Sequence, residues 1–220
     1  MDEPGGSYTF AHGARKVAPF SIAVFGFGVS FGVLAEPTMG RVAPIVMSSV
    51  TFAGSAQFAA ASILQDGGTL GAAVIAAVLL NARYGPIGVS VAPSITGPWW
   101  SRLLKAQLVV DETWALSADG RGGHDAKIIV GAGLVLYAAW VTGTVAGVLF
   151  GDLVGDPARW GLDAAFPALF LALLIPNLDR PHAKPAAIVG AAIALALTPI
   201  APAGVPIVAA GLACLIGWRR

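Results

Sequence analysis

Two short polar interruptions in apolar stretches of the chain carry side chains that could bind a charged ligand. The first lies in "TFAGSAQFAA" at 51–60, where Ser55 and Gln57 follow Gly54. A hydroxyl and an amide both donate and accept hydrogen bonds, and neither tolerates apolar surroundings without a partner. The chemistry available here is therefore hydrogen bonding, either to a polar ligand or to another helix.

Helical geometry separates Gln57 from the neighbouring hydroxyl groups. On a straight helix, Gln57 faces away from the side shared by Ser48, Thr51, Ser55 and Ser62. A break at Gly54 would turn both sets toward one cavity, beside which freed backbone groups are tolerated at membrane depth. The hydroxyl groups serve equally well as hydrogen bonds between helices. For Gln57, whose amide is costlier to bury unpaired, we favour a ligand site shared with Asn81 and Arg83.

The second interruption is "NARYGPIG". Asn81 and Arg83 stand near the middle of an apolar run, just before Gly85 and Pro86. An arginine near the bilayer centre is costly unless it is paired or functional, and a Gly-Pro pair breaks helices. The guanidinium, or the N-terminus of a half-helix after Gly85, would bind a carboxylate. The alternative is that Arg83 forms a structural ion pair or extends to the interface.

The composition places both interruptions in a membrane-embedded chain. The 220 residues are 56% hydrophobic and 11% charged, whereas about a quarter of a typical soluble domain is charged. We therefore expect an all-α integral membrane protein. The formal net charge is +1 and the basic residues are scattered between apolar runs, so no basic face for nucleic acid is expected.

Apolar runs divide the chain into membrane spans. A span needs about 20 mostly apolar residues, and seven candidates are found, at 17–34, 43–64, 70–91, 128–150, 162–178, 185–200 and 205–218. We expect a polar tail at 1–16, too polar and acidic for a signal peptide, and one membrane domain at 17–220. Some of the helices should be broken near the midplane.

An eighth candidate, 99–118, is long enough to cross but contains four charged residues: Arg102, Lys105, Asp111 and Glu112. Because each charge costs about 2.5–3.5 kcal/mol at mid-membrane, the segment crosses only with paired or hydrated charges, and otherwise it lies at the interface. A crossing places the N-terminus in the cytoplasm; otherwise Arg41, Arg102 and Lys105 are cytoplasmic. Both alternatives place the loop at Arg121 inside.

The acidic residues supply a candidate for proton coupling. Asp111 and Glu112 are adjacent, so on a helix they diverge by about 100° and cannot form a side-by-side pair. At most one of them can face Arg83. A titrating carboxyl group inside the membrane is what coupling to a proton gradient requires, and either residue could provide it.

Motifs for enzymatic chemistry are not found in the sequence. Cys214, the single cysteine, lies in an apolar run, and the three histidines lie in polar segments. No nucleotide-binding, metalloprotease or nucleophile-elbow motif occurs in a plausible context. We therefore expect no enzymatic activity, no cofactor and no metal.

A short internal similarity is also present. Gly28 and Gly32 form a GxxxG spacing in one run, and Gly143 and Gly147 form another. The pair indicates either an internal repeat or two close helix contacts, because small residues let membrane helices approach each other.

The motifs "FGFGVSFG", "MSSVTFAGSAQF", "NARYG" and "LLKAQLVVDETWAL", in this order, resemble the AzlC-type family of branched-chain amino acid exporters over roughly residues 17–220. The resemblance implies a multi-pass transporter of the bacterial cytoplasmic membrane that exports leucine, isoleucine, valine and methionine-like amino acids. It also implies a small AzlD-type membrane subunit as a partner. The family often has an Arg-His pair after its asparagine, whereas this chain has Arg83-Tyr84, which weakens any titrating role at that position.

The residues and the resemblance agree on the kind of ligand. An amino acid needs a cation for its carboxylate, acceptors for its ammonium and apolar walls for its side chain. Arg83 and the break at Gly85 would serve the carboxylate; the ammonium would be bound by Ser55, Gln57, Asn81 and the carbonyl groups near Gly54. The alternatives are a passive amino acid or small-solute channel and a non-transporting membrane subunit.

Overall fold

The computed structural model describes residues 9–65, 67–120, 122–154, 171, 174–175, 178–179, 181–201 and 205–217. These residues form helices, and the only strand-like pairing among them is an isolated bridge between Ala118 and His124. The long helices are α1 (Phe10–Met39) and α8 (Ala126–Val154). The shorter elements are α2 (Val42–Thr51), α3 (Gly54–Gln65), α4 (Leu70–Asn81), α5 (Tyr84–Val91), α6 (Trp99–Ala106), α7 (Asp111–Ser117), α10 (Ala183–Leu197), α11 (Val205–Ala210) and the 3₁₀ segment Gly211–Gly217.

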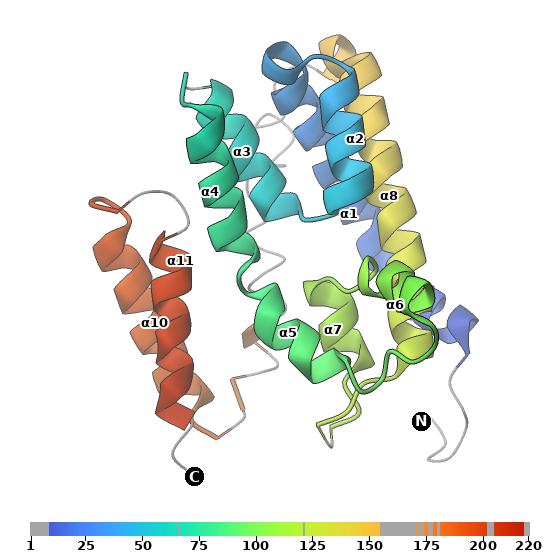
Figure 1. Ribbon diagram of the computed structural model, residues 1–220, viewed down its shortest axis with the longest axis vertical. Helices are drawn as coiled ribbons and strands as arrows, with labels where there is room; N and C mark the ends of the chain where they lie inside the picture. Colours follow the sequence, from blue (N-terminus) through green and yellow to red (C-terminus); the bar gives the residue numbers. More distant parts are fainter. Residues whose placement is uncertain are drawn as a thin grey trace.

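The two GxxxG spacings face each other where α1 packs on α8 (Figure 1). A Cβ atom at Gly28 would lie 3.1 Å from the Cα of Gly143, and one at Gly32 would lie 2.9 Å from the Cα of Gly147. Any side chain there would push the two backbones apart. Because both pairs advance in the same direction, α1 and α8 run parallel, and this close contact accounts for both motifs.

The start of α1 fixes where the N-terminal end lies. The helix begins at Phe10, before the expected boundary at 17, because Thr9 caps it with a hydrogen bond from the His12 N–H. Gly13 then lies against the backbone of Ile128 at the start of α8. The N-terminal end of α1 and the loop that precedes α8 are therefore on the same side of the bundle.

The run at 43–64 does not form one crossing helix, because it turns back within the bundle (Figure 1). α2 runs antiparallel to α8: Ser48 bonds to Thr144, and the next residue, Ser49, accepts a hydrogen bond from the earlier Tyr137. α3 then runs parallel to α1, and the ring of Phe58 packs 5.6 Å from that of Phe31. α2 and α3 form a re-entrant helical hairpin where the sequence predicts a span.

Two described helices, Phe10–Met39 and Ala126–Gly151, are long and apolar enough to cross a membrane. Leu70–Asn81 and Tyr84–Val91 make a third span if this pair, bent by 41°, is counted as one. The sequence predicts seven or eight spans for the whole chain. The predicted run at 162–178 lies mostly outside the described residues.

The charged segment at 99–118 consists of two short helices, α6 and α7, joined by a turn. No residue of α6 is buried, and Trp99 and Trp100 are exposed. α7 packs against α8, and a 3.0 Å hydrogen bond joins Ser117 at the end of α7 to His124 in the loop before α8. The segment is therefore not one continuous crossing helix.

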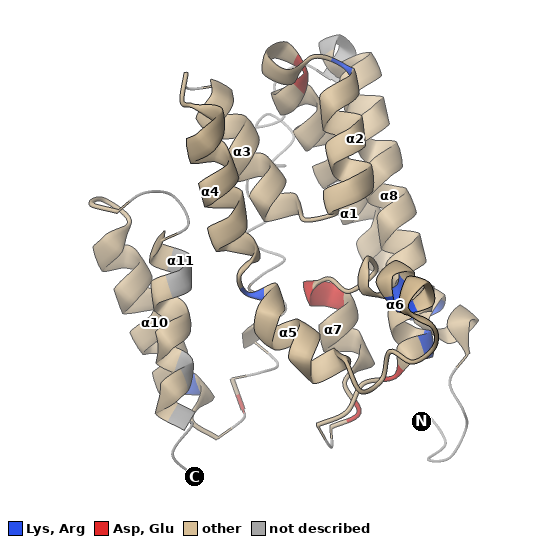
Figure 2. Cartoon of the chain, in the orientation of Figure 1, with Lys and Arg blue, Asp and Glu red and all other residues tan. Residues whose placement is uncertain are grey.

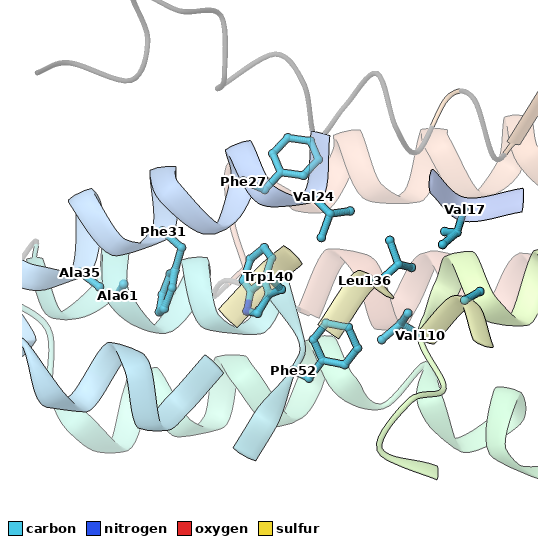
Figure 3. Close-up of a cluster of buried hydrophobic side chains, with 11 residues drawn as sticks. Val17, Val24, Phe27, Phe31, Ala35, Phe52, Ala61, Val110, Leu136 and Trp140 are labelled. Carbon is cyan, nitrogen blue, oxygen red and sulfur yellow. The ribbon is translucent and has the colours of Figure 1, made fainter. Parts of the chain in front are cut away.

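Aromatic side chains from several helices form the centre of the bundle (Figure 3). Phe31 stacks on Trp140 with ring centroids 6.0 Å apart, and Phe27 and Leu136 are fully buried beside them. Phe52, from the turn between α2 and α3, belongs to the same cluster. The core thus holds the turn of the re-entrant hairpin in place.

Candidate functional site

Three interruptions of the helices meet inside the bundle. They are the turn between α2 and α3, the bend between α4 and α5, and the turn between α6 and α7. The Gln107 amide donates to the Val50 carbonyl at 2.8 Å and so joins the third interruption to the first. Arg83, at the bend between α4 and α5, contacts Ser55, which follows the α2–α3 turn, and Asp111, which follows the α6–α7 turn. Irregular backbone at membrane depth is tolerated where it is buried in protein or lines a cavity.

Arg83 stands at the centre of this arrangement. Its guanidinium donates to the Ser55 hydroxyl at 2.9 Å and forms an ion pair with the Asp111 carboxylate at 2.9 Å. The two charged side chains are 24% and 21% exposed. In Figure 2, the blue segment between α4 and α5 faces the red segment that starts α7. A cation, an anion and a hydroxyl group thus converge on one point.

The bend beside Arg83 is caused by Pro86. Proline donates no hydrogen bond and its ring clashes with the carbonyl four residues earlier, which here belongs to Ala82. That carbonyl instead accepts from the Gly85 N–H at 3.0 Å, and α5 begins at Tyr84. The break therefore comes at Ala82–Arg83, before Gly85 rather than after it, and Gly85 lies in the first turn of α5.

The other predicted break also lies earlier than expected. Phe52 ends α2 with φ 43° and ψ 51°, a left-handed conformation, and Gly54 is already the first residue of α3. A left-handed residue commonly ends a helix, although glycine usually occupies the position. The prediction of a break near Gly54 is thus confirmed, with the turn formed by Phe52 and Ala53.

Gln57 holds this turn together. Its Oε1 accepts from the Ala53 N–H at 3.1 Å and from the Trp140 indole at 3.2 Å, while its Nε2 donates to Ser48 at 2.9 Å. Ser48 in turn bonds to Thr144 of α8 at 2.8 Å. The side chain is fully buried and satisfied within the scaffold. The amide therefore lines neither of the cavities lined by Asn81 and Arg83, so the break does not turn Gln57 toward them as we expected from the sequence.

Two cavities adjoin the meeting point. The large cavity, of about 580 Å³, lies between the α2–α3 turn, α5 and α6; small-molecule sites usually occupy about 300–1,000 Å³. It is lined by Thr51, Phe52, Ala53, Asn81, Tyr84, Gly88, Val91, Ala92, Ile95, Trp99, Arg102, Leu103, Ala106, Gln107 and Val109. The small cavity, of about 50 Å³, is lined by Val24, Phe27, Phe52, Gly54, Ser55, Arg83, Tyr84, Val110, Asp111, Glu112, Leu136 and Trp140.

The cavities divide the predicted site residues between them. Ser55, Arg83 and both acidic residues line the small cavity, whereas Asn81 lines the large one. The Oδ1 atom of Asn81 is buried and accepts no hydrogen bond from any described residue. A buried acceptor without a partner is uncommon, so this oxygen needs a donor that the described residues do not supply.

The two adjacent acidic residues differ in their contacts. Asp111 pairs with Arg83, whereas Glu112 lines the same cavity without an ion pair to any residue that the structure describes. Only one of them faces the guanidinium, as helical spacing requires. Among the described residues, no group of three or more His, Cys, Asp or Glu side chains lies close enough to hold a metal.

Sequence reasoning missed two kinds of site residue. Tyr84 lines both cavities, and Val110, Leu136 and Trp140 wall the small one. Apolar and aromatic residues are so frequent in this chain that none of them stands out in the sequence. The position of Tyr84 directly after Arg83 is the one signal that could have identified it.

The chain belongs to the AzlC family. A family model described as "AzlC protein" matches residues 19–154. An uncharacterized membrane protein of Archaeoglobus fulgidus is 32% identical over 96% of this chain and 96% of its own length. The inner membrane protein YgaZ of Escherichia coli is 26% identical over 95% and 89%. The branched-chain amino acid transport protein AzlC of Bacillus subtilis is 25% identical over 83% and 74%.

No solved structure matches the chain. The name of the Bacillus subtilis relative refers to transport, and the names of the Archaeoglobus fulgidus and Escherichia coli relatives describe membrane proteins. The apolar helices of this chain agree with a membrane location.

Proposed function

We propose that this protein exports the branched-chain amino acids leucine, isoleucine and valine, together with methionine-like amino acids, from the cytoplasm by proton-coupled transport. The observation that carries the proposal is the ion pair between Arg83 and Asp111, which lies at three helix interruptions beside a largely apolar cavity. The pair supplies a cation for the carboxylate of a zwitterionic amino acid and an anion for its ammonium group. The transport name of the Bacillus subtilis relative supports the substrate class.

The amino acid head group would replace the internal ion pair. Its carboxylate would bind the guanidinium of Arg83 with help from Ser55, and its ammonium would bind Asp111. At about 50 Å³, the small cavity has room for little more than a water molecule of about 30 Å³. Arg83 and Asp111 must therefore separate before a substrate can enter.

The large cavity would receive the substrate first. Its walls include Val91, Ile95 and Leu103, which suit a branched aliphatic side chain. Asn81 also lines this cavity, and its buried, unpartnered Oδ1 would turn to accept a hydrogen bond from the incoming ammonium. Gln57 would not contact the substrate; it would keep the site in shape by holding the α2–α3 turn through its hydrogen bonds.

Glu112 is our candidate for the coupling proton. It lines the small cavity, and no described residue forms an ion pair with its carboxyl group. Asp111, by contrast, is occupied by Arg83. A carboxyl group that is free to exchange a proton beside the substrate couples the two movements.

The charge distribution supports the proposal that substrate is loaded from the cytoplasm. Blue segments gather at the end of the bundle that contains α6 and the starts of α1 and α8 (Figure 2), and these segments carry Arg15, Lys16, Arg102, Lys105 and Lys127. The positive-inside rule assigns such an end to the cytoplasm. The large cavity lies toward this end, next to α6, so a cytoplasmic amino acid would reach it first. A small AzlD-type membrane subunit would complete the exporter.

The test is efflux in cells that lack their own exporters. The chain is expressed with an AzlD-type subunit, leucine-containing dipeptides are supplied, and cytoplasmic leucine, isoleucine and valine are measured. We expect these pools to fall relative to an empty vector. Counterflow of labelled leucine in proteoliposomes, with and without a pH gradient, separates the alternatives: a passive channel ignores the gradient, and a non-transporting subunit gives no flux. Unchanged pools together with absent counterflow would overturn the proposal.

A further inference from the structure

The two cavities share a wall. Among the described residues, Phe52 and Tyr84 are the only ones that line both the large and the small cavity. Phe52 comes from the α2–α3 turn and Tyr84 from the first turn of α5. Two aromatic side chains from two different helix interruptions therefore stand between the space that fits a ligand and the ion pair.

Phe52 occupies its place against a backbone preference. Its φ of 43° and ψ of 51° lie in the left-handed region, which glycine tolerates and a bulky residue disfavours. Strained residues at an interruption persist when the surroundings hold them, and they occur at ligand clamps and switch regions. Phe52 is only 7% exposed, so the fold buries an aromatic residue at a position where glycine would have no backbone strain.

The Phe52 ring is held by one aromatic neighbour. It packs edge to face on Tyr137 with centroids 5.2 Å apart. Tyr137 is itself fixed, because its hydroxyl donates to the Ser49 carbonyl at 2.7 Å. An edge-to-face contact defines a resting position for the Phe52 ring.

Tyr84 connects this wall to the ion pair. It directly follows Arg83, whose guanidinium carbon lies 5.3 Å from the centre of the tyrosine ring. A movement of the backbone at the bend that separates Arg83 from Asp111 would therefore displace Tyr84 as well. Such a movement would open the wall and the ion pair together.

We propose that Phe52 and Tyr84 form a gate between the two cavities, and that the Phe52 ring sets the upper size of the side chain that passes it. The inference rests on the proposed function, because it assigns a size limit to the same transport path. Aliphatic side chains of the branched-chain class pass when the ring rotates, whereas aromatic side chains are held back. Phe52 is thus a specificity-determining residue.

The transport test compares Phe52→Ala and Phe52→Leu with wild type in proteoliposomes, using labelled leucine and labelled phenylalanine. For Phe52→Ala we expect the ratio of phenylalanine to leucine flux to rise by roughly tenfold or more, a range typical of discrimination by apolar pockets. Phe52→Leu should give a smaller rise. Phe25→Ala serves as the matched control, because Phe25 is 41% exposed and lines neither cavity. A flux ratio that is unchanged in both folded variants would overturn the gate.

A second measurement does not depend on the transported substrate. Cys214, the single cysteine, is replaced by alanine, and Ser55→Cys is introduced in the small cavity. The rate of reaction with a small, water-soluble maleimide is then compared with and without Phe52→Leu. We expect faster labelling when the ring is reduced, even if leucine proves not to be the substrate. Equal labelling rates would show that Phe52 does not form a gate. That result would not bear on the proposed export of amino acids, which the efflux experiment tests separately.

Discussion

Arg83 at the bend between α4 and α5 and Asp111 at the start of α7 form an ion pair of 2.9 Å, and Ser55 of α3 accepts from the same guanidinium at 2.9 Å. Arg83 thus joins the bend between α4 and α5 to the start of α7 and to the first turn of α3. Partly buried charges are retained where they are paired, and here the pairing partners are those that a zwitterion would use. This relationship leads to the first two predictions.

Arg83→Gln should weaken leucine binding by roughly tenfold or more, equivalent to about 1.4 kcal/mol, because the charge-assisted bond to the carboxylate is lost. Binding is measured by leucine-dependent thermal stabilisation of the purified protein. Arg41→Gln is the matched control, since Arg41 is 71% exposed and pairs with Glu36 only at 3.6 Å. Wild-type affinity in Arg83→Gln would show that the guanidinium is structural.

Glu112→Gln should abolish accumulation of leucine against its gradient and leave exchange of labelled leucine intact, because exchange need not move the proton. Asp111→Asn should lose both activities, since Asp111 also balances Arg83. Both are measured in proteoliposomes with an imposed pH gradient. If both single variants still accumulate leucine against its gradient, neither residue carries the coupling proton.

Gln57→Ala should lower stability more than substrate affinity. The substitution leaves the Ala53 N–H and the Trp140 indole N–H without their acceptor, and each unsatisfied buried group costs about 1–3 kcal/mol. The thermal midpoint in detergent and the leucine affinity of the folded fraction are measured together. Ser49→Ala is the control, because among the described residues that hydroxyl donates to the Ile45 carbonyl of its own helix at 2.8 Å and to no other helix. Reduced affinity at unchanged stability would instead support direct substrate binding by Gln57.

Gly28→Leu should disrupt packing of α1 on α8 and reduce the amount of folded protein severely, because its Cβ alone would lie 2.5 Å from the Trp140 carbonyl oxygen. Gly143→Leu should do the same from the opposite helix. Gly71→Ala tests the general effect of adding a side chain, since the nearest atom to its Cβ is 3.9 Å away. Folded protein is quantified by size-exclusion chromatography in detergent. Wild-type yields of both leucine variants would argue against the close contact.

Much of the site could be predicted from local chemistry. A polar or charged side chain in an apolar run must have a partner or a function, so Ser55, Arg83 and Asp111 were identifiable without coordinates. The break in 51–60 followed from the same argument. Its position at Phe52 did not, because a left-handed phenylalanine is stabilised by distant packing on Tyr137 rather than by its own preference.

The crossing pattern was decided by tertiary structure. A run such as 43–64 is long enough to span the membrane. Its length and hydropathy are the same whether it crosses the membrane or turns back, so neither property distinguishes the two. It turns back because Gln57, Trp140 and Thr144 supply hydrogen-bond partners at the turn. One of these belongs to α3 and two belong to α8, far along the chain, so no local pattern contains them.

The sequence by itself thus determined that this protein is embedded in a membrane and which polar residues need a partner or a function there. The reason is that the cost of a polar group in an apolar run depends on that group and its immediate surroundings. Only the tertiary structure decided which of those residues meet: Gln57 with the scaffold, Asp111 rather than Glu112 with Arg83, and Asn81 with the large cavity. The physical reason is that a hydrogen bond or an ion pair requires a partner within about 3 Å in a defined direction. That partner is supplied by the packing of helices that are distant in the chain.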